Sequence, residues 1–300
     1  MSRLLANKKV VIIGPGLIGG SVARGLAQQK LDCEVTVVGR NENVLRDIVA
    51  EGNASGYSTD IKKACENADL VLVAVPSLTV EAVLAEIGDT SAVVTDAASV
   101  KGEVIGAARR VFGEVPANFV PGHPIAGSEH SGYTASFPAL FHGKKVILTP
   151  LDNTDAAAVE LVTALWEMLG AEVLQMDVPQ HDAVLAATSH LPHLLAFALV
   201  DTLSQQGASE EIFRYAAGGF RDFTRIASSD PQMWHDIFLA NGEPTVTVLD
   251  DYIENLYRLR KVIQEKDSAE LMTTFTRAKE SRDRFLELLA AGGATDKQSP

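Results

Sequence analysis

Two clusters of polar residues follow apolar, strand-like runs of the chain and carry the side chains best suited to acid–base chemistry. They are Asp96-Ala-Ala-Ser-Val-Lys101 and Gly122-His-Pro-Ile-Ala-Gly-Ser-Glu129. Because active sites of parallel α/β sheets lie at the carboxyl ends of strands, we expect both clusters at one edge of a sheet. His123 is the candidate general base, since the ordinary pKa of histidine, about 6.5, allows proton exchange at neutral pH. The alternative is an inert histidine in a loop.

A third cluster, Ser189-His-Leu-Pro-His193, places His190 and His193 on one face of a predicted helix. Pro192 between them removes a backbone hydrogen bond, and a kink of this kind often marks a cavity. Zinc binding is the alternative for such a pair, but no HExxH pattern or third ligand stands nearby. We therefore expect no metal.

A fourth cluster, Gly218-Gly-Phe-Arg-Asp-Phe-Thr-Arg225, contributes two guanidinium groups to an otherwise acidic protein. Arginine binds carboxylates through two parallel hydrogen bonds, so Arg221 and Arg225 are candidates for holding an anionic substrate. The alternative for each is a surface ion pair with Asp222 or Asp230.

The apolar run Val10–Ile13 ends in a glycine-rich turn with the pattern G-x-G-x-x-G and then becomes helical. In such a turn the backbone and the helix N-terminus face a pyrophosphate, so we expect a bound dinucleotide. The alternative is a tight strand–helix turn that binds nothing. The expected cofactor-binding set adds two residues at the end of the run Leu70–Val75 and consists of Gly14, Gly16, Leu17, Ile18, Gly19, Val75 and Pro76, with Arg40.

Arg40 stands after the second apolar run, where NAD-specific proteins place an acidic residue about 20 residues beyond the glycines. An arginine at this point accommodates the 2′-phosphate of NADP, and no carboxylate remains to repel that phosphate. We therefore expect NADP to be preferred and NAD to be the second cofactor. The alternative is that Arg40 is a solvated surface charge.

Composition limits the class of protein. The 300 residues are 46% hydrophobic, enough for a large core, and the formal net charge of −13 argues against nucleic acid or an acidic membrane as partner. Two cysteines, Cys33 and Cys65, are too few for a disulfide framework. No uninterrupted apolar run approaches the roughly 18 residues of a membrane span, and no signal peptide precedes the first strand. We expect a cytoplasmic protein that acts on a small molecule.

Strand-like runs recur through the first half of the chain, separated by amphipathic helical stretches such as Val22–Gln29 and Val44–Ala50. Because they are nearly continuous in Val, Ile and Leu, they predict an α/β fold with a parallel sheet covered by helices on both faces. A helix over Ala156–Leu169 and a strand over Glu172–Met176 follow. The runs are Val10–Ile13, Val35–Val38, Leu70–Val75, Ala92–Thr95, Asn118–Val120 and Lys145–Leu148.

Beyond Pro179 the pattern is helical throughout. We predict a dinucleotide-binding domain over 1–177, a helical domain over 178–290 and a disordered tail over 291–300. Val184–Val200 is apolar or small at nearly every position, which favours a helix shared across a subunit interface over the alternative, a central helix of one bundle. The helical patterns are His181–Leu203, Pro231–Leu239, Thr245–Gln264 and Ser268–Leu289.

Four motifs in order, Gly14–Ser21, Gly122–Glu129, Ser189–His193 and Gly219–Ala227, resemble those of the prephenate and arogenate dehydrogenases of tyrosine biosynthesis. The resemblance implies a Rossmann-type, mostly parallel sheet domain followed by an all-α dimerisation domain, with the active site between them. It also implies a homodimer that uses NADP or NAD. The implied reaction is oxidative decarboxylation of prephenate to 4-hydroxyphenylpyruvate, or of arogenate to tyrosine.

The same resemblance implies roles for individual residues. His123 accepts the proton of the ring hydroxyl, and Ser99 orients that hydroxyl and the nicotinamide. Arg225 pairs with a substrate carboxylate, and His193 lies near the side-chain keto group, which favours prephenate over arogenate. Residues that shape or gate the substrate pocket in relatives correspond to His181, Asp222, Glu129 and Trp234; the last two, with His190, complete the expected substrate-binding set.

Two other functions stay open. Another two-domain dehydrogenase, of the β-hydroxyacid or imine-reducing type, relies chiefly on a helical lysine or other polar groups, and His181–Leu203 contains no lysine. A regulatory protein that binds nucleotide without turnover has no need of a base and a carboxylate clamp, so the set His123, His193 and Arg225 argues against it.

Overall fold

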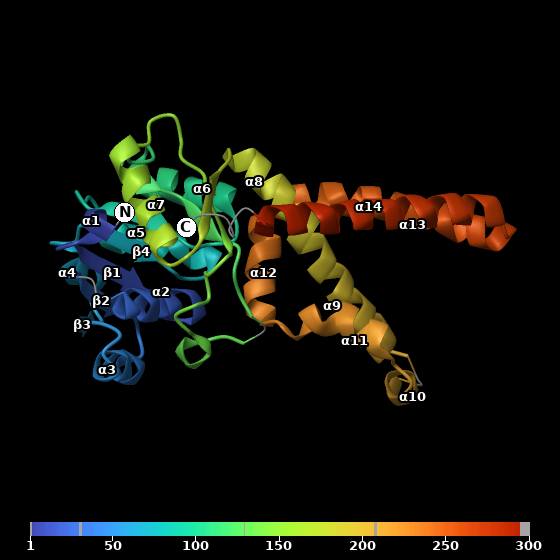
Figure 1. Ribbon diagram of the computed structural model, residues 1–300, viewed down its shortest axis with the longest axis horizontal. Coiled ribbons are helices and arrows are strands. Elements are labelled where there is room, and N and C mark those ends of the chain that lie inside the picture. Colours follow the sequence, from blue (N-terminus) through green and yellow to red (C-terminus); the bar gives the residue numbers. More distant parts are fainter. Residues whose placement is uncertain (1, 30–31, 129, 207–208, 295–300) are drawn as a thin grey trace. The chain divides into compact units, whose positions relative to one another are not determined.

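The protein is described by a computed structural model over residues 2–29, 32–128, 130–206 and 209–294 (Figure 1). The chain divides into two compact units, residues 1–245 and 246–300. The domain boundary expected at residue 177 lies inside the first unit and stays a prediction.

The first unit contains a six-stranded sheet in which all neighbouring strands are parallel, as the sequence predicts. The strand order is β3-β2-β1-β4-β5-β6. From β1 the chain adds β2 and β3 on one side of the sheet, and from β4 it adds β5 and β6 on the other. Ligands of such sheets bind at the switch point between β1 and β4. The strands are β1 (Lys9–Ile13), β2 (Glu34–Val38), β3 (Gly56–Ser58), β4 (Leu70–Val73), β5 (Val93–Asp96) and β6 (Phe119–Val120).

Both faces of this sheet are buried, which explains the continuous apolar runs. In β1, Val10 and Ile12 belong to one core cluster, whereas Val11 and Ile13 belong to another on the opposite face. Residues of α2, α3 and α7 complete the first cluster, and residues of α5 and α6 complete the second. The helices of this region are α1 (Ser2–Leu5), α2 (Leu17–Gln28), α3 (Glu42–Ala50), α4 (Ile61–Cys65), α5 (Val80–Ile87), α6 (Lys101–Phe112) and α7 (Ala156–Met168), with 3₁₀ turns η1 (Ser77–Thr79) and η2 (Tyr133–Ala135).

A second sheet of three strands, β7-β8-β9, departs from the expectation of one continuous sheet. β7 (Gly122–Pro124) pairs antiparallel with β8 (Lys145–Leu148), and β9 (Glu172–Gln175) pairs parallel with β8. The His123 motif was expected at the carboxyl end of a strand of the parallel sheet, but His123 lies within β7, opposite Ile147. Pairing with β8 therefore fixes the backbone of the candidate base.

A continuous helix, Val178–Ser204, follows the second sheet (Figure 1). It consists of α8 (Val178–Leu185), a π-helical segment η3 (Ala186–His190) and α9 (Leu191–Ser204). The π-helical turn, in which the Leu191 N–H donates to the Ala186 carbonyl, stands directly before Pro192. Next come α10 (Ser209–Arg214), α11 (Gly218–Thr224), the 3₁₀ turn η4 (Arg225–Ser228), α12 (Pro231–Ala240) and the start of α13 (Gly242–Glu265).

By length and composition the helix Val178–Ser204 could cross a membrane, with a mean hydropathy of 1.6 in its most apolar window. His181, Asp182 and His190 interrupt the apolar residues of this helix, so the sequence contains no uninterrupted apolar run of membrane-spanning length here. All three are buried within the first unit. Only 22% of the most apolar window is buried within the chain.

The second unit, from residue 246, holds the remainder of α13 and α14 (Ser268–Ala294). Arg258 of α13 pairs with Glu270 of α14, so the two helices run side by side. Helix α14 continues four residues into the segment expected as a tail, and residues 295–300 lie outside the described residues.

We predict that Gly19→Ala lowers the free energy of unfolding by about 1–3 kcal/mol, the usual cost of overpacking. A Cβ at Gly19 would lie 2.5 Å from the Gly14 carbonyl oxygen and 3.0 Å from Ile12 Cγ2. The matched control is Gly106→Ala in α6, whose added Cβ meets only the far end of the long Arg110 side chain; it should leave stability unchanged or raise it slightly. Chemical denaturation followed by circular dichroism measures both. Equal stability of the two variants would contradict this packing.

Candidate active site

The glycine-rich turn between β1 and α2 has the geometry of a phosphate cradle. Gly14 has a φ of +86°, and a Cβ there would lie 2.5 Å from the Ala74 carbonyl oxygen. Gly19 is crowded in the same way, but a Cβ on Gly16 would meet nothing within 4 Å. Gly16 is also the residue before the first turn of α2, where unpaired N–H groups attract an anion. The residues present therefore fit a dinucleotide whose diphosphate approaches Gly16.

The other expected cofactor residues surround this turn. Val75 follows β4, and its Cγ1 would be 2.8 Å from a Cβ on Gly14; Pro76 comes next. Leu17 and Ile18 are half-buried in the first turn of α2. After β2, Gly39 lies against Pro15, and Arg40 follows it with an exposed side chain. The fold thus gathers these residues at one edge of the sheet.

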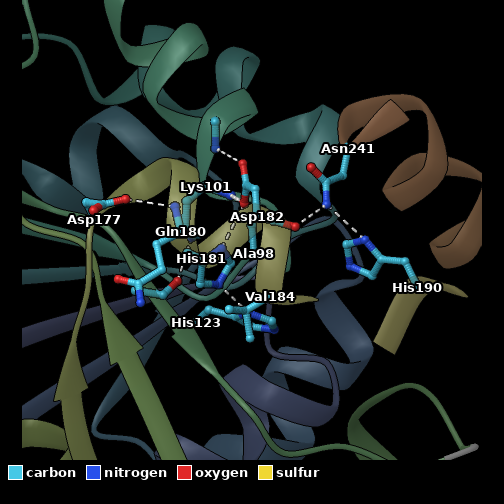
Figure 2. Close-up of polar contacts among 12 residues, drawn as sticks. Ala98, Lys101, His123, Asp177, Gln180, His181, Asp182, Val184, His190 and Asn241 are labelled. Atoms are coloured by element: carbon cyan, nitrogen blue, oxygen red, sulfur yellow. Dashed lines mark hydrogen bonds and ion pairs between the residues drawn. The ribbon is translucent and has the colours of Figure 1, made fainter. Parts of the chain in front are cut away.

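His123 is the first member of a buried hydrogen-bonded chain. Its Nδ1 lies 2.9 Å from Nε2 of His181, and His181 Nδ1 lies 2.8 Å from Oδ1 of Asp182. Figure 2 shows His181 between the other two side chains. His123 comes from β7, whereas His181 and Asp182 come from α8. These two hydrogen bonds therefore join the second sheet to the long helix.

The position of each proton in this chain follows from the acceptor at its end. A carboxylate only accepts, so His181 Nδ1 donates to Asp182, and neutral His181 keeps a lone pair at Nε2. His123 Nδ1 must then donate to that lone pair. As a result His123 Nε2 carries a lone pair of its own, and no hydrogen bond engages it among the described residues. This is the arrangement of a general base held by a second group.

Asp182 is also an anchor for α6. Its Oδ1 accepts from the Lys101 N–H at 2.9 Å and its Oδ2 from the Gly102 N–H at 2.7 Å. Burial raises the pKa of Asp182, but the hydrogen bonds from His181 and from these two N–H groups outweigh burial, and the pKa lies below 3.8. The carboxylate is therefore ionised at neutral pH.

The fully buried Lys101 joins the two sheets. Its Nζ pairs with the Asp96 carboxylate at the end of β5 and donates to the Gly122 carbonyl oxygen at 2.6 Å. Asp96 in turn accepts from the Gly122 N–H at 3.1 Å. Gly122, the residue before His123, is thus held through both its N–H and its carbonyl group.

Burial above all, followed by His181 and Lys101, lowers the pKa of His123 well below 6.5.

His190 lies in the same buried region and is held by Asn241. The Asn241 amide nitrogen donates to the Asp182 carbonyl oxygen at 2.9 Å and contacts His190 Nδ1 at 3.0 Å. An NH₂ group only donates, so His190 Nδ1 accepts, and neutral His190 carries its proton on Nε2. Burial is the largest cause that lowers the pKa of His190 to about 4.

His193 and Trp234 are in direct contact. Their rings stack with centroids 3.7 Å apart, and Trp234 is packed with Val100, the neighbour of half-buried Ser99. The buried indole nitrogen of Trp234 has no hydrogen-bond partner among the described residues. Arg225, at the start of η4, is near enough to His193 to lower its pKa.

Two of the expected residues have largely exposed side chains in this chain. Arg221 and Asp222 have side chains 83% and 79% exposed and pair loosely with each other at 3.8 Å. Glu129 lies outside the described residues. Among the residues that the structure describes, no group of three or more His, Cys, Asp or Glu side chains could hold a metal ion.

Two contributors to the site, Asp182 and Asn241, were not singled out from the sequence, and Lys101 was named there only as a member of the Asp96–Lys101 cluster, without a role. A signal existed for Asp182, because a charged residue beside His181 in a mostly apolar helix requires a buried partner. Asn241 stands alone at the junction of α12 and α13, and only the fold places it against His190.

The fold and this site define a dinucleotide-dependent oxidoreductase. Family models described as the nucleotide-binding domain and the dimerization domain of prephenate dehydrogenase match residues 22–175 and 177–277. Cyclohexadienyl dehydrogenase of Zymomonas mobilis is 37% identical over 281 residues, 92% of this chain and 95% of the relative. Prephenate dehydrogenase of Bacillus subtilis is 33% identical over 288 residues, 91% of this chain and 75% of the relative.

A solved structure agrees with these sequence matches. The crystal structure of Aquifex aeolicus prephenate dehydrogenase in complex with hydroxyphenyl propionate and NAD+ has a TM-score of 0.87 and 37% identity, and the match covers 94% of this chain and 99% of that one. The chain belongs to the prephenate dehydrogenase family.

We predict that Asp182→Asn lowers the free energy of unfolding at pH 7 by about 2–4 kcal/mol, because an amide cannot accept every hydrogen bond that the carboxylate accepts. The pKa of Asp182 is lower in the folded than in the unfolded state. Its stabilisation is therefore present above 3.8 and is lost as the pH falls through the folded value.

Denaturant unfolding at pH 7 and below pH 3.8 measures the difference between wild type and variant, which should shrink in acid. Asp152→Asn, at an exposed position, is the control and should match wild type at both pH values. A difference that does not depend on pH would contradict the ionised state of Asp182.

Proposed function

We propose that the protein catalyses oxidative decarboxylation of prephenate to 4-hydroxyphenylpyruvate, and of arogenate to tyrosine, with His123 as general base. The observation that carries this proposal is the His123–His181–Asp182 chain, which leaves a lone pair on a buried imidazole in a member of this family. The names of the relatives support the substrate class, since they include a prephenate and a cyclohexadienyl dehydrogenase.

In this mechanism His123 Nε2 removes the proton of the ring hydroxyl. The imidazolium that forms is stabilised by His181, which accepts from Nδ1, and by the negative charge of Asp182 behind it. A dinucleotide held at the glycine-rich turn between β1 and α2 would supply the oxidant, a hydride acceptor for the hydrogen at C4 of the ring. The bond from the ring to its carboxylate breaks, carbon dioxide leaves, and the bonding electrons complete the aromatic ring.

The lowered pKa of His123 suits this role. A base must be unprotonated before the reaction, and burial of His123 keeps it neutral at pH 7. The same burial makes the imidazolium costly, so the compensating charge of Asp182 matters most while the proton is held on His123.

We assign substrate binding to the cationic and polar groups around His193. A dianion must be held by local cations in a chain of net charge −13, because distant charges are screened beyond about 8–10 Å. We assign a substrate carboxylate to Arg225, whose positive charge is near enough to His193 to lower its pKa. Ser99 next to Val100 orients the hydroxyl, and His190 and Trp234 complete the pocket.

We also propose NADP as the preferred cofactor. Arg40 follows β2 with an exposed side chain, beside the glycine-rich turn. The nearest acidic residue along the chain, Glu42, is paired with Arg46 at 2.8 Å and accepts from Tyr57 at 3.1 Å. Its charge is therefore partly neutralised, which leaves Arg40 able to meet a 2′-phosphate.

A homodimer formed through the helical region completes the proposal. The family model over residues 177–277 is described as a dimerization domain. The long helix Val178–Ser204 has only 22% of its apolar window buried within one chain. A second copy would cover this surface.

The direct test is the appearance of reduced-nicotinamide absorbance when the protein is mixed with prephenate and NADP. Wild type should turn over, and His123→Asn should bind cofactor normally while its kcat falls by roughly 10²–10⁴, the range for loss of a general base. Activity of His123→Asn within threefold of wild type would show that the base is misassigned.

Cofactor choice is tested by Arg40→Ala. We expect kcat/KM with NADP to fall about 10–100-fold, the effect of losing hydrogen bonds to a charged group, whereas kcat/KM with NAD stays within about threefold. Steady-state kinetics with both cofactors measures this. A wild-type preference for NAD of tenfold or more would contradict the assignment.

A further inference from the structure

His193 is held in one orientation by two contacts. Its Nδ1 lies 2.7 Å from the Ser189 carbonyl oxygen, one turn back on the same helix, and its ring stacks on Trp234 at 3.7 Å with an interplanar angle of 23°. A carbonyl oxygen only accepts, so Nδ1 must carry a proton. When His193 is neutral, its Nε2 therefore presents a lone pair and cannot donate.

The proton on Nδ1 decides which group of the substrate side chain His193 Nε2 can bind. A keto oxygen is an acceptor and needs a donor, so it is complementary to Nε2 only when His193 is protonated. An ammonium group is a donor and is complementary to the lone pair of neutral His193. We propose that His193 discriminates between the two substrates at their side chain, with the neutral ring selecting the amino group of arogenate and the protonated ring the keto group of prephenate. This inference rests on the proposed function.

The neighbours of His193 favour its neutral form. Burial lowers the pKa of His193 most, the hydrogen bond to Ser189 raises it, and the positive charge of Arg225 lowers it further. His190 on the preceding turn is the other titratable neighbour, and α12 presents the uncharged ring of Trp234. On α11, Arg221 and Asp222 are exposed and pair with each other.

His190 carries its proton on the other ring nitrogen from His193. Asn241 forces the proton of neutral His190 onto Nε2, so His190 offers a donor where His193 offers an acceptor. The helix thus presents two imidazoles of opposite hydrogen-bonding character. A substrate whose side chain ends in both a carboxylate and an ammonium can satisfy such a pair, together with Arg225.

The test compares kcat/KM for arogenate with kcat/KM for prephenate between pH 5 and 8. The ratio should rise about tenfold, the effect of one charge-assisted hydrogen bond, as the pH increases through the titration of His193. Effects of His123 on the chemical step are common to both substrates and cancel in the ratio. His193→Gln should make the ratio independent of pH, whereas His235→Gln, at a histidine whose side chain is 58% exposed, should leave the wild-type dependence in place.

Two-bond ¹H–¹⁵N correlation spectra of the histidine rings, with His193 assigned from the His193→Gln variant, supply a readout independent of activity. We expect the Nδ1–H form at pH 7 and a titration whose midpoint matches that of the ratio. A proton on Nε2 of neutral His193, or a ratio that stays constant while His193 titrates, would overturn the proposal. If His193 stays neutral throughout, a ratio favouring prephenate would overturn it equally.

Binding of the two products separates this proposal from the proposed function. Tyrosine and 4-hydroxyphenylpyruvate differ in the same amino and keto groups, and calorimetry in the presence of NADP measures their affinities without turnover. If neither substrate is turned over, the proposed function fails, and the pH dependence of the two product affinities still supports or overturns the role of His193.

Discussion

The candidate active site depends on the hydrogen bonds that the carboxylate of Asp182 accepts. The carboxylate accepts hydrogen bonds from two backbone N–H groups at the start of α6 and from His181. The first two fix the position of α8 against the nucleotide-binding sheet, and the third fixes His181 and, through it, His123. One buried charge therefore sets both the packing of two elements and the proton positions of two imidazoles. These hydrogen bonds offset the cost of removing the charged carboxylate from water.

Buried imidazoles need such partners because each must make its hydrogen bonds without water. His123, His181 and His190 are each at most 8% exposed, and each has a defined partner at Nδ1. When all three are neutral, the partner also decides whether Nε2 donates or accepts. The chemistry available at each ring is thus set by a neighbouring residue: Asp182 through His181 for His123, and Asn241 for His190.

Much of the first domain could be predicted from local pattern, because strands buried on both faces must be continuously apolar and the glycine turn has strict steric needs. Gly14 and Gly19 are crowded and Gly16 is open, as the motif requires. The short strand β3, Gly-Tyr-Ser, has no such pattern and was missed. The placement of Lys145–Leu148 in a second sheet could not be seen, since an apolar run predicts a strand but not its partner.

His123, His190 and His193 could be singled out from the sequence by residue type, but their hydrogen-bonding states could not. The spacing of His190 and His193 correctly suggested a shared helix, but it could not show that one ring is fixed by an amide on a distant helix and the other by a carbonyl on its own. From its residue type and the family resemblance, His193 was assigned to a keto oxygen. With Nδ1 committed to Ser189, that assignment requires a protonated ring, which burial and Arg225 both oppose. Specificity at this position therefore depends on backbone geometry that no motif encodes.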